Sequence, residues 1–239
     1  MSFFRRGKKD DLPSYVKVKK SPRAKRLALR LNPKERIFHL VIPRGMSISK
    51  ARAFAEEHDR WMRQQLRDLP ESIQLKNGSM VPILGRTREI KVVRSEKLRT
   101  TEILLKHNEL LVFTHLDDPS QRILRFLKNL AREELERLSH EKAERIGKKI
   151  DYVGVRDTKS RWGSCSEDNR LSYSWRLIFA PTEAMDYVVA HEVAHLKHLD
   201  HSDRFWGLCR KLSDNYLDGH FWMHNCGHEL MRYTAARQD

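Results

Sequence analysis

The chain has 239 residues, of which 39% are hydrophobic, and a formal net charge of +15 at pH 7. This length allows one good hydrophobic core, or one core with a smaller appended lobe. No apolar run approaches the ~18 residues of a membrane span, and the start, MSFFRRGKKDD, has no apolar stretch behind its charges. We therefore expect no membrane span and no secretion signal. Three widely spaced cysteines suit a reducing cytoplasm better than a disulfide scaffold, so the predicted location is cytoplasmic.

The positive charge is concentrated in the first part of the chain. Residues 1–100 hold 26 Lys and Arg against 10 Asp and Glu, whereas residues 101–239 hold 21 against 22. The densest stretch runs from Arg5 to Arg30. Such a cluster attracts phosphate backbones, so a nucleic acid or another polyanion is a candidate partner. A solvated basic face with no dedicated partner is the alternative.

Residues 1–117 are predicted to form a basic, β-rich lobe with one helix. Strands are expected over residues 26–32 and 36–42, where apolar residues alternate or run together before a proline and a glycine. Ser47 can then cap a helix that runs to about Leu69. Two hairpins follow in the prediction: they pair residues 81–84 with 89–93, and 102–106 with 110–113.

Near residue 117 the apolar period changes from that of strands to that of helices. We take this change as the boundary of a second domain, residues 118–239. A long helix is predicted from Pro119 to Gly147, because proline is well tolerated in a first turn and glycine is a good C-cap. Strands are expected over residues 152–155 and 171–178. The predicted fold class is therefore α+β.

The next predicted helix contains HEVAH at residues 191–195, which matches the pattern H-E-x-x-H. Residues four apart lie about 40° apart around a helix, so the imidazoles of His191 and His195 can converge on one Zn²⁺. Glu192 lies further round, beside the metal, where it can take a proton from a water on the metal. Apolar residues on the opposite side of the helix indicate that it separates a core from a polar cleft.

A third ligand is needed, because a catalytic zinc site has three protein ligands and one open position. On a continuing helix His198 lies about 10 Å and His201 about 15 Å from His191 along the axis, so neither reaches the ion. His201 becomes a ligand if the helix ends soon after residue 198 and Ser202 caps a new one. The spacing of His191 and His201 equals that in H-E-x-x-H-x-x-G-x-x-H zinc proteases, with His198 in place of the glycine. The predicted ligands are His191, His195 and His201.

Several stretches occur in a fixed order: KSRWGSCS at 159–166, LSYSWRL at 171–177, DYVVAHEVAHLKH at 186–198, His201-Ser202 and Phe205-Trp206. Together they resemble the YgjP-like metallopeptidase family, which is related to the SprT-like and Wss1-like zinc proteases. The resemblance covers most of the chain. It implies a zinc-dependent hydrolase in which the three predicted ligands hold the metal, Glu192 is catalytic, and residues 118–239 form a zincin-like metallopeptidase domain.

The predicted function is a zinc metallopeptidase with Glu192 as general base, acting on a protein or peptide substrate. The strand over residues 171–178 is expected to be an edge strand on which an extended substrate pairs. Two alternatives remain. One is a nucleic-acid-associated protease acting on DNA-bound proteins, by analogy with the SprT-like relatives, and the other is a non-catalytic zinc-binding module.

Weaker signals surround the motif. Arg161, Trp162 and His198 are candidate substrate-binding residues, and Cys165 is a candidate fourth ligand. Tyr187 is a candidate donor to an oxyanion. Packing is the alternative for Trp162, Cys165 and Tyr187, because a tryptophan, a tyrosine or a free cysteine commonly fills a core.

The end of the chain carries a further group of metal-binding residue types. Their spacings could serve a second metal, and a flexible tail is the alternative. Glu229 is a second candidate for the third ligand of the first site, although His201 is nearer in the sequence. The group consists of His220, His224, Cys226 and His228.

Overall fold

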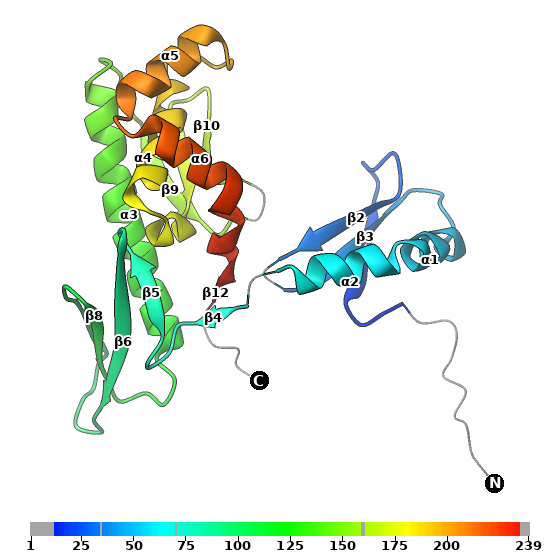
Figure 1. The fold of residues 1–239 in the computed structure, drawn as a ribbon, viewed down its shortest axis with the longest axis horizontal. Coiled ribbons are helices and arrows are strands. Elements are labelled where there is room, and N and C mark those ends of the chain that lie inside the picture. The colour runs from blue at the N-terminus through cyan, green and yellow to red at the C-terminus, as the bar shows by residue number, and fades with distance from the viewer. Residues whose placement is uncertain (1–11, 34, 70, 159–160, 235–239) are drawn as a thin grey trace. The chain divides into compact units, whose positions relative to one another are not determined.

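The computed structural model describes residues 12–33, 35–69, 71–158 and 161–234. Its contacts divide the chain into two compact units, Met1–Glu71 and Ser72–Asp239, each with its own hydrophobic core (Figure 1). They are called the N-terminal unit and the C-terminal unit below. The stretch MSFFRRGKKDD, where the densest positive charge begins, lies outside the described residues. A search of the described helices for one long and apolar enough to cross a membrane found none.

The N-terminal unit is a three-stranded sheet with two helices. The order of its strands is β1 (Val16–Ser21), β3 (Ile37–Pro43), β2 (Ala28–Asn32), with β1 parallel and β2 antiparallel to β3. The helix expected up to about Leu69 is two helices, α1 (Ile48–Glu57) and α2 (Asp59–Arg67).

One face of this sheet packs against both helices. Phe38, Leu40 and Ile42 alternate along β3 and lie in one buried cluster with Ala51 of α1 and Met62 of α2. The cap predicted for α1 is confirmed, since the Ser47 side chain accepts a hydrogen bond from the backbone N of Lys50 at 3.3 Å. The apolar alternation of the central strand therefore decides which face the helices cover.

The C-terminal unit begins with a four-stranded sheet of order β5-β6-β8-β7. Both predicted hairpins are confirmed, because β5 (Met80–Ile83) pairs antiparallel with β6 (Arg86–Arg94) and β7 (Glu102–Leu105) pairs antiparallel with β8 (Glu109–Thr114). The parallel pairing of β6 with β8 joins them into one sheet.

This sheet shares its core with the helices that follow, so the boundary expected near residue 117 lies inside the C-terminal unit. Val81 and Ile90 of the sheet belong to one buried cluster with Ile123 of the long helix α3 (Ser120–Glu144). The hairpin turn also docks on the later chain, because the backbone N of Leu84 donates to the carbonyl O of Ile178 at 2.9 Å. The change of period marks a change of element type, and the two kinds of element bury one another.

A second, three-stranded sheet lies in this unit, with the order β10-β11-β9. Its strands are β9 (Tyr152–Arg156), β10 (Gly163–Cys165) and β11 (Arg170–Ser174). The prediction of a strand over residues 171–178 is wrong in its second half, because Trp175–Phe179 forms a 3₁₀ helix. Its expected place at the edge is also wrong, because β11 lies between the other two strands and β10 is an edge.

The remaining helices form the last part of the C-terminal unit. The buried Lys142 of α3 connects two of them to α3. Its Nζ lies 2.5 Å from a carboxylate oxygen of Asp186 in α4 (Thr182–Ala194), and it donates to the carbonyl O of Leu212, the last residue of α5 (Asp203–Leu212), at 2.6 Å. Because Lys142 is 3% exposed, these partners offset the cost of burying its charge. The elements are α4 (Thr182–Ala194), α5 (Asp203–Leu212), α6 (Tyr216–Cys226), a 3₁₀ helix (Gly227–Arg232), and β12 (Tyr233–Thr234) paired with β4 (Ile73–Gln74).

Candidate metal centre and active site

The chain leaves helix α4 and turns back within the histidine-rich stretch. α4 ends at Ala194, and His195 is its C-cap. Residues 195–197 form a turn, and α5 begins at Asp203 after the N-cap Ser202. The predicted break is present, and it comes a few residues earlier than expected. It allows His201 to return toward α4.

Three imidazoles meet at this turn. The ring centroids of His191, His195 and His201 lie 4.8 to 5.1 Å apart, and one ligand atom from each lies within 4.8 Å of the others. The Nε2 atoms of His191 and His201 are 3.2 Å apart. Tetrahedral nitrogen ligands at about 2.0–2.1 Å from one Zn²⁺ lie about 3.3 Å from each other, so this separation fits a shared ion. Within the described parts of the chain, this is the one group of at least three His, Cys, Asp or Glu residues with such spacing.

The surroundings of the rings hold them in this arrangement. His195 Nδ1 lies 3.0 Å from the carbonyl O of His198, so Nδ1 carries the hydrogen and the lone pair of Nε2 is left available to a metal. His198 thus contributes its main-chain oxygen, and its ring is not part of the cluster. Phe205 of α5 is fully buried, and its ring centroid lies 4.5, 4.9 and 4.7 Å from those of His195, His191 and His201.

The protonation of the rings also fits a metal. Burial, together with the neighbouring histidines, lowers the pKa of His191 to about 4. Burial lowers the pKa of His195 as well. Both rings are therefore neutral at pH 7 and offer lone pairs, which is the form that binds a cation. Three imidazoles are a donor set typical of a catalytic zinc site.

Glu192 is buried beside the cluster, with 6% of its surface exposed. Burial raises the pKa of its carboxyl group to about 8, and the positive charge of Arg161 opposes this shift. Gly163 of the edge strand β10 lies directly against it, because a Cβ at position 163 would be 2.4 Å from Glu192 Oε1. The glycine in RWGSC is therefore a site of close approach between β10 and α4, which its place in the sequence did not predict.

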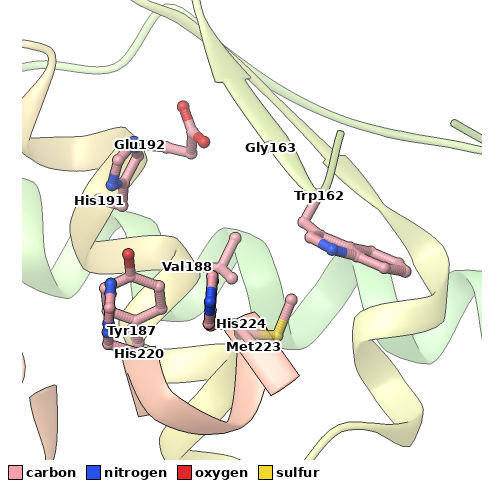
Figure 2. A pocket seen from close by; sticks show the side chains of 9 residues that line it. All are labelled: Trp162, Gly163, Tyr187, Val188, His191, Glu192, His220, Met223 and His224. Carbon is pink, nitrogen blue, oxygen red and sulfur yellow. The ribbon is translucent and has the colours of Figure 1, made fainter. Parts of the chain in front are cut away.

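A cavity of about 260 Å³ opens beside His191 and Glu192 (Figure 2). Trp162 lies on its opposite side, and His220 and His224 of α6 complete the lining. The tail predicted as flexible, or as a second metal site, is thus partly a helix that lines the cavity. In the described part of the chain its histidines belong to no metal-binding group.

A close contact between helices lets α6 reach the cavity. A Cβ at Gly219 would lie 2.3 Å from the carbonyl O of Glu183 and 2.6 Å from the Cβ of Tyr187, both in α4. Tyr187 lines the cavity, and its ring centroid is 6.1 Å from that of His191 and 5.4 Å from that of His220. The spacing of His220 and His224, four apart, is the sequence signal that could have predicted this helix face.

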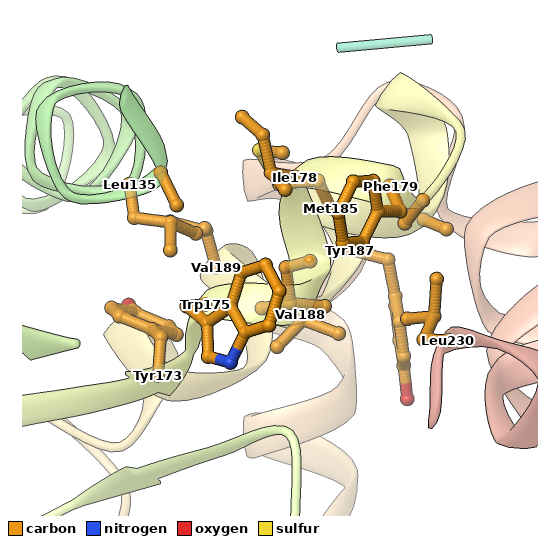
Figure 3. Close-up of a cluster of buried hydrophobic side chains, with 14 of the residues drawn as sticks. Leu135, Tyr173, Trp175, Ile178, Phe179, Met185, Tyr187, Val188, Val189 and Leu230 are labelled. Atoms are coloured by element: carbon orange, nitrogen blue, oxygen red, sulfur yellow. The ribbon is translucent and has the colours of Figure 1, made fainter. Parts of the chain in front are cut away.

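The other side of α4 faces the core, as its apolar stripe predicts. Val189 and Met185 lie in one buried cluster with Tyr173, Trp175 and Phe179 (Figure 3). Val189 is fully buried and Met185 is 2% exposed. One helix therefore carries both the core contacts and the histidine site, so the site lies on a rigid element.

The weaker candidates have different surroundings. Arg161 is exposed, whereas Trp162 is half-buried and meets Gly227, at which a Cβ would lie 3.3 Å from the indole Nε1. Burial raises the pKa of the Cys165 thiol to about 11, and Cys165 is not part of the histidine cluster. Glu229 is exposed and lines a different pocket. Residues 159–160 of the KSRWGSCS stretch lie outside the described residues.

Similarity to known proteins agrees with this geometry. A family model described as YgjP-like, metallopeptidase domain, matches residues 25–225. No curated protein matches the chain. Among solved structures, the crystal structure of the metallopeptidase zymogen of Pyrococcus abyssi abylysin is similar, with 22% sequence identity and a TM-score of 0.35 over 39% of this chain and 95% of that chain. Because the family model spans most of the sequence, the chain belongs to the YgjP-like metallopeptidase family.

Proposed function

We propose that the protein is a zinc-dependent peptidase whose metal is held by His191, His195 and His201. The observation that supports this most is the convergence of the three imidazoles next to a buried glutamate at a cavity. Three nitrogen ligands leave one coordination position open, as hydrolytic zinc sites require. A purely structural zinc site is instead closed by four protein ligands, and the described residues supply three.

Zinc in such a site polarises the substrate carbonyl and makes water acidic enough to lose a proton near neutral pH. Glu192 accepts this proton as the water oxygen bonds to the peptide carbon. It then donates the proton to the leaving amine as the C–N bond breaks. Glu192 is suited to this role because it is buried at the cavity beside His191.

The free side of β10 is the proposed place for the substrate backbone. The carbonyl O of Trp162 accepts a hydrogen bond from the backbone N of Ser174 at 2.8 Å, so Trp162 pairs with the neighbouring strand β11. Successive backbone groups of a strand point in opposite directions, so those of Gly163 point to the free side. An extended peptide that pairs there passes directly by Glu192, which Gly163 contacts.

Metal analysis combined with peptide hydrolysis tests the proposal. Protein purified without added zinc is expected to contain about one zinc per chain by mass spectrometry. It is also expected to cleave members of a quenched-fluorescent peptide library. Glu192→Gln should keep the zinc and lose the cleavage, which separates a peptidase from a non-catalytic zinc-binding module. Equal cleavage by the two proteins, or wild-type protein without zinc, would refute the proposal.

A further inference from the structure

The N-terminal unit holds most of the protein's excess positive charge. Residues 1–71 contain 19 Lys and Arg against 8 Asp and Glu, whereas residues 72–239 contain 28 against 24. Within residues 17–30 there are seven basic residues and no acidic one. All seven of these side chains are exposed: Lys17, Lys19, Lys20, Arg23, Lys25, Arg26 and Arg30.

The strand register gathers part of this charge on one face of the sheet. Lys17 of β1 and Arg30 of β2 both pair with His39 of the central strand, so these three side chains lie in one row. Lys19 follows two residues further along β1, on the same face. Phe38 points to the other face, where α1 and α2 pack. Among the described residues no helix covers the face that carries Lys17, Lys19, Arg30 and His39, which we call the basic face.

The ion pair found between described residues of the N-terminal unit does not involve the cations of the basic face. The acidic residues of α1 and α2 lie across the sheet from the basic face. Within α2, this ion pair joins Asp59 to Arg63 at 2.7 Å. Lys17, Lys19 and Arg30 make no ion pair within the described parts of the chain. Their charge is therefore available to a partner, and the row across three strands fixes its position.

We propose that the basic face and the adjoining loop between β1 and β2 bind double-stranded DNA through its phosphate backbone. A duplex offers a dense, regular row of negative charges, and a protein gains affinity by displacing the counterions around them. The sheet positions of the basic face carry no aromatic side chain except His39. Single-strand binding surfaces use aromatic rings to stack bases, so this face favours a duplex and reads no sequence.

The distribution of apolar residues argues against a membrane as the partner. A surface that binds lipid presents large apolar side chains next to its cations. The described large apolar residues of the N-terminal unit that are exposed are Val18, Met46, Ile48 and Trp61. Val18 pairs with Leu40 and Trp61 contacts Phe38, so both lie on the side opposite the basic face, and Met46 and Ile48 lie at the start of α1. The positions around the basic face hold the half-buried Ala28 and the buried Val41. The basic face therefore offers charge without an apolar surface that could enter a bilayer.

Binding of the full-length protein to a fluorescent duplex, followed by anisotropy between 50 and 200 mM salt, tests the proposal. The test variant is Lys17→Gln/Lys19→Gln/Arg30→Gln. The matched control, Lys50→Gln/Arg60→Gln/Arg67→Gln, removes the same charge from exposed positions on α1 and α2. Each phosphate contact contributes about 0.9 to the salt slope and about eightfold to affinity at 0.1 M salt.

Loss of two to three phosphate contacts is expected to lower the salt slope by about 2–3 and the affinity by roughly 60- to 500-fold. The control should bind like the wild type, and so should Glu192→Gln, because the proposed DNA surface is independent of peptidase activity. No DNA binding at 50 mM salt would overturn the proposal. Equal losses in both triple variants would show a net-charge effect, and tighter binding to polyglutamate or anionic vesicles would identify another partner.

Discussion

The contact between Gly163 and Glu192 leads to a sharp test of how the carboxylate proposed as the general base is positioned. In Gly163→Ala the new methyl group would lie 2.4 Å from Glu192 Oε1, 2.5 Å from its Cγ and 2.7 Å from its Cδ. Atoms in ordinary contact are about 3.5 Å apart, so the carboxyl group must move by about 1 Å. The backbone at Gly163 is not in the left-handed region, so the strain comes from this contact alone.

A displacement of about 1 Å in a catalytic group can cost roughly 100-fold in rate. We therefore expect kcat/KM for a cleaved library peptide to fall about 100-fold, which equals about 2.7 kcal/mol of transition-state stabilisation. Zinc content should stay at the wild-type level, because the three histidines lie on other segments of the chain.

The matched control is Gly207→Ala in α5, where a Cβ would meet nothing within 4 Å. This substitution should keep the activity and raise stability by roughly 0.5–1 kcal/mol, since alanine is favoured over glycine within a helix. Both variants would be assayed for peptide cleavage, zinc content and thermal unfolding. Wild-type cleavage by Gly163→Ala would refute the positioning of Glu192 described above.

Three further predictions follow from the same structure. His201→Ala should lose most of its zinc in a metal assay, whereas His198→Ala should retain it, because residue 198 contributes its main-chain oxygen. The reverse result would show that His201 is not the third ligand. Gly219→Ala should destabilise the C-terminal unit by roughly 1–3 kcal/mol in chemical denaturation, because its methyl group overlaps the α4 backbone, and an unchanged midpoint would contradict this. Zinc at 100 times its Kd should stabilise the C-terminal unit by about 2.7 kcal/mol and raise its Tm by roughly 5–11 °C in calorimetry. An equal shift of the N-terminal unit's transition would argue against a zinc site confined to the C-terminal unit.

The arrangement of the histidines could be predicted because it depends on local geometry. Two histidines four apart on a helix share a face whatever the rest of the fold does. The return of His201 needs only a helix end, and Asp200 and Ser202 are residue types that favour one. The structure has Ser202 Oγ donating to Asp200 Oδ1 at 2.9 Å in this turn.

The contacts of Gly163 and Gly219 could not be predicted, because they join segments that are far apart in the sequence. A glycine's spacing within a motif does not reveal which side chain will approach it. Likewise α6 carries no clear apolar stripe, and it depends on the close approach of Gly219 to α4. Without that tertiary contact the segment has no apolar periodicity that would predict a helix.

The strand β1 and the domain boundary illustrate a similar limit. Four of the six residues of β1 are exposed, so the strand has no apolar alternation that would predict it. Its partner is the central strand β3, which supplies the hydrogen bonds. The boundary depends on which elements share a core, and the sheet of β5–β8 shares its core with α3. A change in the spacing of apolar residues along the chain cannot reveal which elements share a core.

The most direct measurement of the central claim is a map of new peptide termini. A lysate would be incubated with wild-type protein or with Glu192→Gln, each loaded with zinc, and new N-termini would be identified by mass spectrometry. A zinc-dependent peptidase with Glu192 as its base should produce a set of termini that appears with wild type and is absent with Glu192→Gln and after chelation. Identical termini with both proteins, or none with either, would contradict it.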